Sequence, residues 1–258
     1  MTGTAHGIHA DSIGSGPLVV LVHGTAPAVW GDVPRRLAAE GRTVVTYWRR
    51  SYPPSDPSPV SSLRQHTEDL GALIAARGGH AVVVGWSVGG VIALDLATRQ
   101  PERVDGLVLL EAALHLKHRP SPAMVRAVVS ARLRGKRDAP AGARRFLRWA
   151  LSRRDAPDDL GRLEPRLVDA CGEAIVAELA LGTGERELGP RDLASITVPV
   201  RWLVGTQSRA AFRTSARRAS VHAPAMTVQQ VPGAGHIVQL DDPTAVVEAV
   251  VHHQRHTP

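Results

Sequence analysis

The sequence predicts an α/β protein with a mostly parallel sheet flanked by helices, and three observations lead to this fold class. Between residues 17 and 111, short runs of β-branched and aliphatic residues alternate with segments of helical length, as in βαβ units. One run, Leu18–Val22, is purely aliphatic, which is typical of a strand buried on both faces. The chain has 258 residues, of which 43% are hydrophobic and 21% charged. It can therefore bury a core as one large domain, and intrinsic disorder is excluded.

The elements of the first half follow from where these runs begin and end. Strands are expected over residues 17–22, 43–47, 81–85 and 104–110, and helices over 30–40, 63–77 and 89–99. Gly41, Gly78 and Pro101 are placed to end the three helices, because glycine and proline interrupt a helical backbone. Residues 51–60 are rich in proline and serine and are expected to form a surface loop.

The second half begins with helices. Ser121 and Pro122 supply an N-cap and a proline at the first helical position, and Gly135 is placed to end that helix. Further helices are expected over residues 143–151, 165–181 and 243–253, and strands over 198–205 and 226–231. The strandless stretch predicts a helical cap, residues 112–190, inserted into an α/β core formed by residues 1–111 and 191–258.

Positive charge is concentrated in one segment. The net charge is +7, yet between Lys117 and Arg154 there are twelve basic residues and one acid, Asp138, which gives +11 there and −4 elsewhere. Such a segment is usually the solvated outer face of amphipathic helices. The alternative is a surface that attracts an anionic substrate or an acidic carrier protein. Nucleic-acid binding is not expected, because the helices show no recognised binding fold or aromatic stacking array.

The sequence also carries signals of location. No apolar run approaches the ~20 residues that span a bilayer. The first residues show neither the basic start nor the apolar stretch of a secretory signal. The single cysteine, Cys171, cannot form an internal disulfide and fits a reducing compartment. We therefore expect a cytoplasmic protein without membrane contact, and nothing in the sequence indicates an oligomeric state.

A glycine-rich turn contains the candidate nucleophile. Gly85-Trp-Ser-Val-Gly-Gly90 follows a predicted buried strand and opens a predicted helix. In a sharp strand-to-helix turn, small neighbours relieve crowding around a strained central residue, whose side chain is then held at the positive end of the helix. Ser87 occupies that central position. The alternative is a glycine-rich turn with an incidental serine, but both flanking elements that the motif requires are predicted here.

Two other loops supply candidate partners for Ser87. The His23-Gly-Thr25 loop ends the first aliphatic strand, and the amide of Thr25 together with that of Val88 could form an oxyanion hole. His23 itself is expected to be structural. The late loop Val231-Pro-Gly-Ala-Gly-His236 has glycines that allow a tight turn, which makes His236 the candidate general base.

These features together resemble the α/β-hydrolase superfamily. The resemblance is carried by the His-Gly loop, the Ser87 turn, the helical insertion after the sixth core strand and the Gly-Ala-Gly-His loop, and it covers nearly the whole chain except the cap. It implies the α/β-hydrolase fold. It also implies that Ser87 is the nucleophile, that His236 is the base and that the amides of Thr25 and Val88 form the oxyanion hole.

Two motifs depart from the family pattern. Many members carry an aspartate in a Gly-x-x-Asp turn after the penultimate strand, but here that turn reads Gly205-Thr-Gln-Ser208. Members also often show an Asp-x-Arg-Gly-x-Gly loop after an early strand, where this chain has Trp48-Arg-Arg-Ser-Tyr-Pro53.

Glu111 is the candidate for the missing acid. A histidine base needs a partner that fixes its tautomer and stabilises imidazolium. Glu111 ends the predicted strand after the elbow helix, which places it at the carboxyl edge of the sheet, where α/β proteins hold their sites. A minority of the superfamily, including haloalkane dehalogenases and zearalenone-type lactone hydrolases, has its acid there. The alternatives are Asp155 or no acid at all, with Glu111 as a helix cap or an exposed acid.

The predicted activity is hydrolysis of a carboxylic ester or lactone through an acyl-serine intermediate. Dehalogenase chemistry is excluded because residue 87 is not a carboxylate. No metal or organic cofactor is expected, and Trp86 and Ile237 are candidates to line the substrate pocket. One alternative is a lyase, cyclase or acyltransferase of secondary metabolism that uses the same triad. Another is a non-catalytic ligand-binding homologue, which the missing acid after Gly205 favours.

Overall fold

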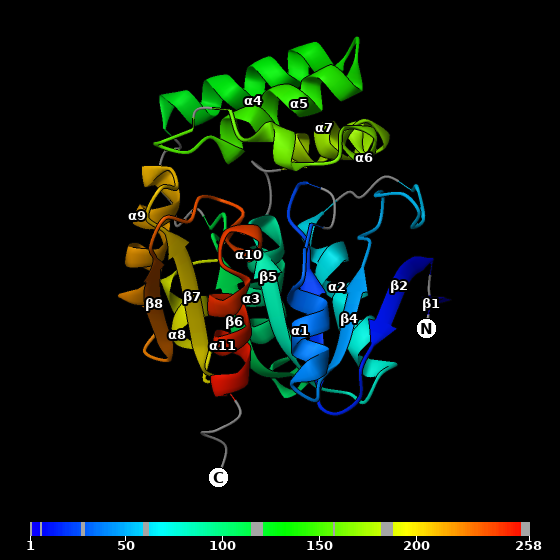
Figure 1. The fold of residues 1–258 in the computed structure, drawn as a ribbon, viewed down its shortest axis with the longest axis vertical. Coiled ribbons are helices and arrows are strands. Elements are labelled where there is room, and N and C mark those ends of the chain that lie inside the picture. The colour runs from blue at the N-terminus through cyan, green and yellow to red at the C-terminus, as the bar shows by residue number, and fades with distance from the viewer. Residues whose placement is uncertain are drawn as a thin grey trace.

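An eight-stranded sheet crosses the molecule (Figure 1). The computed structural model describes residues 2–5, 7–26, 29–58, 62–114, 121–156, 158–181 and 188–253. The strands lie in the order β1-β2-β4-β3-β5-β6-β7-β8. Their bounds are β1 Thr2–Ala5, β2 Ile8–Ile13, β3 Leu18–Val22, β4 Thr43–Tyr47, β5 Ala81–Trp86, β6 Val104–Leu110, β7 Val200–Gly205 and β8 Met226–Val231.

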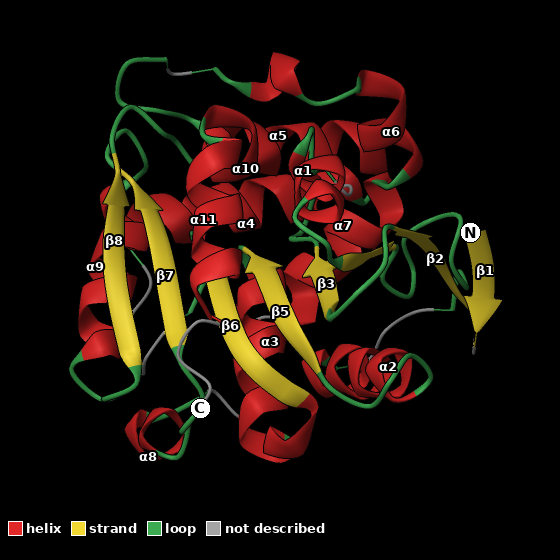
Figure 2. Cartoon of the chain, turned by 60° about the horizontal axis from the view of Figure 1, so that its bottom comes forward, coloured by secondary structure: helices red, strands yellow, loops and turns green. Residues whose placement is uncertain are grey.

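The sheet is parallel from β4 to β8, as predicted, and its far edge is an antiparallel addition. β2 pairs antiparallel with β4, and β1 pairs antiparallel with β2. These two strands were not predicted, because β2 alternates apolar Ile8 and Ala10 with polar residues rather than forming an aliphatic run. Figure 2 shows β1 and β8 at opposite edges of the twisted sheet. The central strands β3, β5 and β6 are therefore buried on both faces.

Helices cover both faces of the sheet. α1 (Val33–Ala39) and α11 (Pro243–His253) lie in front of it in Figure 1, and α2 (Leu63–Ala75) and α3 (Val88–Arg99) lie behind it. α8 (Pro190–Ala194) and α9 (Ala210–Ser220) belong to the same core as α3, whereas α10 (Val238–Asp241) belongs to the core of α11. Side chains of β3 alternate between the two cores, because successive residues of a strand face opposite ways.

A helical cap stands beyond one end of the sheet, at the top of Figure 1. It consists of α4 (Pro122–Gly135), α5 (Ala139–Leu151), α6 (Pro165–Ala170) and α7 (Gly172–Leu181). The single helix predicted over 165–181 is in fact two helices that meet at Cys171. Gly172 is required at the start of α7, since a Cβ there would lie 2.8 Å from the backbone nitrogen of Pro140. α5 begins at Ala139, earlier than predicted, because the Asp138 carboxylate caps it by accepting from the Ala141 amide (2.9 Å).

The predicted architecture, a mostly parallel sheet flanked by helices with a helical cap inserted after β6, is confirmed. The cap boundaries at residues 112 and 190 stay a prediction, because residues 115–120 and 182–187 lie outside the described part of the chain. Within that part, no helix has both the length and the apolar character needed to cross a membrane.

Candidate active site

Two neighbouring strands end in residues with unusual backbone conformations. Ser87 follows β5 with φ of 54°, and Glu111 follows β6 with φ of 51°. Few non-glycine residues adopt positive φ, and those that do cluster at functional sites, where the surrounding structure holds them in place. Here the Ser87 amide donates to the Leu110 carbonyl (2.9 Å), and the Glu111 amide donates to the Leu203 carbonyl (3.0 Å). The carboxyl edge of the sheet thus presents both side chains side by side.

The glycines around Ser87 are there because other backbone segments pack against the turn. A Cβ at Gly85 would lie 2.5 Å from the Gly89 carbonyl oxygen, and a Cβ at Gly89 would lie 2.1 Å from the Val22 carbonyl oxygen. Gly90 in turn packs against Ala112. α3 begins directly after Ser87, so the dipole of this helix favours negative charge beside the Ser87 hydroxyl.

Glu111 is completely buried and is surrounded by donors. Its Oε1 accepts a hydrogen bond from the Gly205 amide (2.7 Å) and its Oε2 accepts one from the Ser208 hydroxyl. Oε2 also lies 3.3 Å from Nδ1 of His236. These two donors fix the Glu111 carboxyl group beside the His236 ring.

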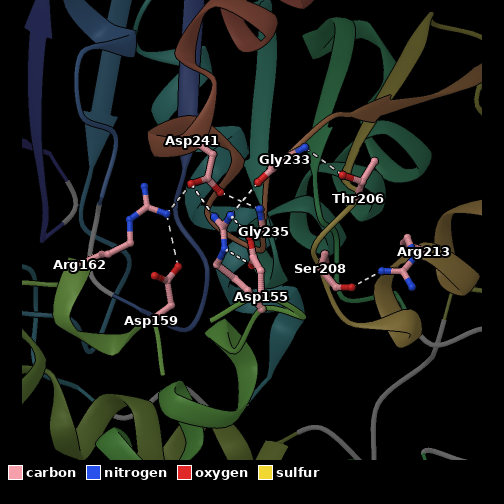
Figure 3. Close-up of polar contacts among 10 residues, drawn as sticks. Asp155, Asp159, Arg162, Thr206, Ser208, Arg213, Gly233, Gly235 and Asp241 are labelled. Atoms are coloured by element: carbon pink, nitrogen blue, oxygen red, sulfur yellow. Dashed lines mark hydrogen bonds and ion pairs between the residues drawn. The ribbon is translucent and has the colours of Figure 1, made fainter. Parts of the chain in front are cut away.

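Ser208 lies in the turn after β7, at the position of the aspartate in the Gly-x-x-Asp pattern. The structure gives it a role that sequence reasoning missed: its hydroxyl donates a hydrogen bond to the Glu111 carboxylate. Its own carbonyl accepts a hydrogen bond from Arg213 of α9 (Figure 3). The sequence signal was the Gly205-Thr-Gln-Ser208 turn, but the link to Glu111 spans 97 residues and depends on the pairing of β6 with β7.

His236 is buried and held on several sides. Its ring contacts Glu111 through Nδ1 and stacks on Phe212 with centroids 4.1 Å apart. Its backbone carbonyl accepts a hydrogen bond from Nε1 of Trp86 (2.8 Å). Phe212 is a second residue that sequence reasoning missed. Among the described contacts, no hydrogen bond joins Ser87 to the His236 ring. In hydrolases without substrate this contact is often long and tightens when substrate binds.

The loop that carries His236 is fastened by charged side chains (Figure 3). Asp241 Oδ2 accepts from the Gly235 amide (2.7 Å), while its Oδ1 pairs with Arg153 (3.0 Å) and Arg162 (2.5 Å). Arg153 also donates to the Gly233 carbonyl (2.7 Å). Both arginines follow the α5 helix of the cap, so cap and core together fix this loop.

The His23 loop packs directly against Ser87. A Cβ at Gly24 would lie 2.8 Å from the Ser87 Cβ. His23 Nδ1 contacts the Gly24 and Ala26 carbonyl oxygens (2.8 and 3.0 Å), and its Nε2 accepts from the Arg49 amide (3.0 Å). Burial, and then the Arg49 charge, lower the pKa of His23 well below its usual value. The ring is therefore neutral with its proton on Nδ1, in the structural role that was expected.

The remaining candidates are placed as follows. Trp86 and Ile237 are buried within one apolar core cluster, and their role as pocket walls stays a prediction. Asp155, the alternative acid, pairs with Arg153 and is half exposed. Among the described residues, no group of three or more His, Cys, Asp or Glu side chains is arranged to hold a metal ion.

Comparisons with known proteins identify the family and the fold. The model of the alpha/beta hydrolase family matches residues 19–249. A pimeloyl-[acyl-carrier protein] methyl ester esterase from Xanthomonas campestris is 30% identical over 252 residues, which cover 94% of this chain and 97% of that protein. Among solved structures, a bromoperoxidase from Bacillus anthracis has a TM-score of 0.80 at 19% identity, over 96% of this chain and 95% of its own. An esterase from Exiguobacterium antarcticum has a TM-score of 0.79 at 22% identity, over 95% and 94%.

Proposed function

Since the chain belongs to the α/β-hydrolase family, we propose that it is a serine hydrolase that cleaves a carboxylic ester or lactone through an acyl-serine intermediate. The relatives support an esterase function. The observation that carries the finer proposal is the 3.3 Å contact between Glu111 Oε2 and His236 Nδ1 at the sheet edge that also carries Ser87.

The proposed mechanism assigns one step to each group. The Ser87 hydroxyl attacks the carbonyl carbon while Nε2 of His236 takes its proton, and Glu111 stabilises the imidazolium that forms. The amides of Thr25 and Val88 donate to the oxyanion of the tetrahedral intermediate. The leaving alkoxide receives the proton from His236, and a water molecule activated by the same ring then releases the acid. No metal or organic cofactor takes part in this scheme.

The arrangement around Glu111 argues against a non-catalytic ligand-binding protein. That alternative is based on the missing aspartate after β7, but the fully buried Glu111 contacts Nδ1 of His236, which supports a catalytic role. Burying a carboxylate is costly unless it is well hydrogen-bonded, and Ser208 and Gly205 supply those bonds. A lyase, cyclase or acyltransferase would use the same groups, and only the products separate these classes from a hydrolase.

The proposed function is tested by replacing Ser87 with alanine. The wild-type protein is expected to hydrolyse short p-nitrophenyl esters to the free acid and to be labelled covalently by a fluorophosphonate. Ser87→Ala should lose both, because the attacking hydroxyl is gone, and should keep the wild-type melting temperature. Unchanged labelling of Ser87→Ala would rule out Ser87 as the nucleophile, and products other than the acid would favour the alternative reaction classes.

The surface of the cap suggests how the substrate is presented. On α4, the apolar residues Val125, Val129 and Leu133 are 44%, 47% and 60% exposed and lie one turn apart on one face. Exposed Arg126 and Arg132 flank this stripe. An apolar stripe between arginines complements an acidic protein. As part of the same proposal, the ester is attached to a carrier protein, as in the name of the Xanthomonas campestris relative. We propose that this carrier is acidic and that the reaction takes place in the cytoplasm.

Charge reversal on α4 tests the carrier. Arg126→Glu/Arg132→Glu is expected to raise KM for a carrier-bound ester about tenfold or more and to leave kcat/KM for p-nitrophenyl butyrate unchanged. Arg191→Glu on α8, an exposed arginine outside the cap, is the matched control and should change neither. Equal losses on both substrates, or no loss on the carrier-bound ester, would contradict docking on α4.

A further inference from the structure

A buried ion pair connects the cap to the loop expected to form the oxyanion hole. Glu178 lies on α7 of the cap, and its carboxylate accepts from Nη2 of Arg49 at 2.9 and 3.2 Å. The Arg49 side chain is completely buried in the core. The same Nη2 donates to the carbonyl oxygen of Gly24 (2.7 Å). Hydrogen bonds therefore link a cap carboxylate, a core guanidinium and a loop carbonyl in one continuous series.

Because the peptide bond is planar, this series of hydrogen bonds affects the orientation of an amide in the active site. The Gly24 carbonyl and the Thr25 amide belong to one peptide unit, in which C=O and N–H point in opposite directions. Fixing the Gly24 oxygen therefore fixes the direction of the Thr25 N–H. A cation bonded to the oxygen also polarises the unit and makes its N–H a stronger donor. His23 Nδ1 contacts the same oxygen (2.8 Å).

Arg49 can hold this position only while its charge is balanced. Among the described residues, Glu178 is the one carboxylate that pairs with Arg49. Nε and Nη1 of Arg49 have no hydrogen-bond partner among those residues. A buried charge that loses its partner is strongly destabilised and drives rearrangement. Glu178 therefore determines whether the guanidinium stays on the Gly24 carbonyl.

We propose that Glu178 and Arg49 are positioning residues that orient and polarise the Thr25 amide, so that seating of the cap sets the strength of the oxyanion hole. This inference rests on the proposed acyl-serine mechanism. Neither residue touches the substrate in this scheme. Arg49 acts through the Gly24–Thr25 peptide, and Glu178 acts through Arg49.

Tyr52 offers a matched control within the same cluster. Its hydroxyl donates to Glu178 and lies 3.2 Å from the carbonyl oxygen of Thr25. That oxygen belongs to the following peptide unit, whose N–H is that of Ala26. Tyr52→Phe thus removes a hydrogen bond to Glu178 and a contact with the loop but leaves the Arg49 contact with Gly24 in place.

The experiment measures kcat and KM for p-nitrophenyl butyrate, Ki for an aliphatic trifluoromethyl ketone, and the melting temperature. The ketone forms a tetrahedral adduct with a nucleophilic serine and so reports on the oxyanion hole. Glu178→Gln should lower kcat about tenfold and raise Ki by the same factor, with KM within about twofold of wild type. Loss of one whole oxyanion donor, about 10²–10³-fold, sets the upper bound. Tyr52→Phe should keep kcat and Ki within about threefold.

A charge-free pair separates positioning from stability. Arg49→Met/Glu178→Leu removes both charges and should have nearly the melting temperature of the wild type, because apolar pairs replace buried ion pairs well. Its kcat and Ki should nevertheless stay at least tenfold impaired. A stable double variant with wild-type kcat and Ki would overturn the proposal, as would equal losses in Glu178→Gln and Tyr52→Phe. If the double variant does not fold, the comparison of those two single variants decides. Ser87→Ala with full activity would instead overturn the underlying mechanism.

Discussion

Two buried regions beside Ser87 each contain a histidine and a carboxylate, yet their electrostatics are opposite. In the first, Glu111 lies against His236 and is otherwise held by neutral donors. In the second, Glu178 is paired with Arg49, and that cation, rather than the carboxylate, lies next to His23. A carboxylate favours a protonated ring and a cation disfavours it.

The difference supports His236 rather than His23 as the proposed general base. Both nitrogens of His23 contact backbone groups, and its pKa is lowered by burial and by Arg49. His236 has its carboxylate contact on Nδ1, and in the proposed mechanism Nε2 takes the proton of Ser87. The Glu178 carboxylate of the second region forms an ion pair with Arg49. Because its charge is balanced by that pair, it is suited to a structural role rather than to proton transfer.

Replacing the glutamate of each region by glutamine should give the largest difference between the two regions. Glu111→Gln should lower kcat by about 10³–10⁴-fold, since a neutral amide neither stabilises imidazolium nor favours the required tautomer. Glu178→Gln should lower it only about tenfold. Steady-state kinetics on p-nitrophenyl butyrate, with melting temperatures to verify folding, measure both. Should Glu111→Gln stay within tenfold of the wild type, the acid of the mechanism lies elsewhere and the two regions do not differ as described.

The two regions also differ in how far the sequence could predict them. Ser87 and His236 could be proposed because a strand-to-helix turn and a tight glycine turn have local sequence signatures, and their catalytic roles stay predictions. Glu111 was found from its place at the end of a strand, and its contact with His236 is now visible, while its catalytic role stays a prediction. Arg49 and Glu178 could not be paired, because they lie 129 residues apart and meet only when the cap packs on the core.

Parts of the fold were unpredictable for related reasons. The aliphatic strands β3, β5 and β6 have a strong pattern because both of their faces are buried. The edge strands β1 and β2 lack it. α9 was missed although it carries Phe212 against His236, because its sequence, Ala210–Ser220, is rich in arginine and gives a weak apolar signal.

The second region makes a smaller prediction about pH. His66 on α2 is buried near Arg49, and its pKa, like that of His23, is lowered well below 6.5, first by burial and then by that cation. Well above pH 6.5 both rings are neutral in the folded and the unfolded chain and add no pH dependence. As the pH falls below 6.5, the unfolded chain binds protons that the folded one cannot. The free energy of unfolding should then fall by up to about 1.4 kcal/mol per pH unit for each histidine.

His66→Leu isolates one of these contributions. Nδ1 of His66 has no hydrogen-bond partner among the described residues, so an apolar side chain of similar size should cost little stability at pH 7.5. Between pH 6.5 and 5, urea unfolding of His66→Leu should show a slope against pH that is smaller by up to about 1.4 kcal/mol per unit than that of the wild type. The carboxyl pKa values of residues such as Asp32 and Asp56 are lowered from 3.8, so these groups titrate below pH 5 and do not contribute to the slope between pH 6.5 and 5. An unchanged slope would mean that His66 takes up its proton in the folded protein, and the cation beside it would then not define this region.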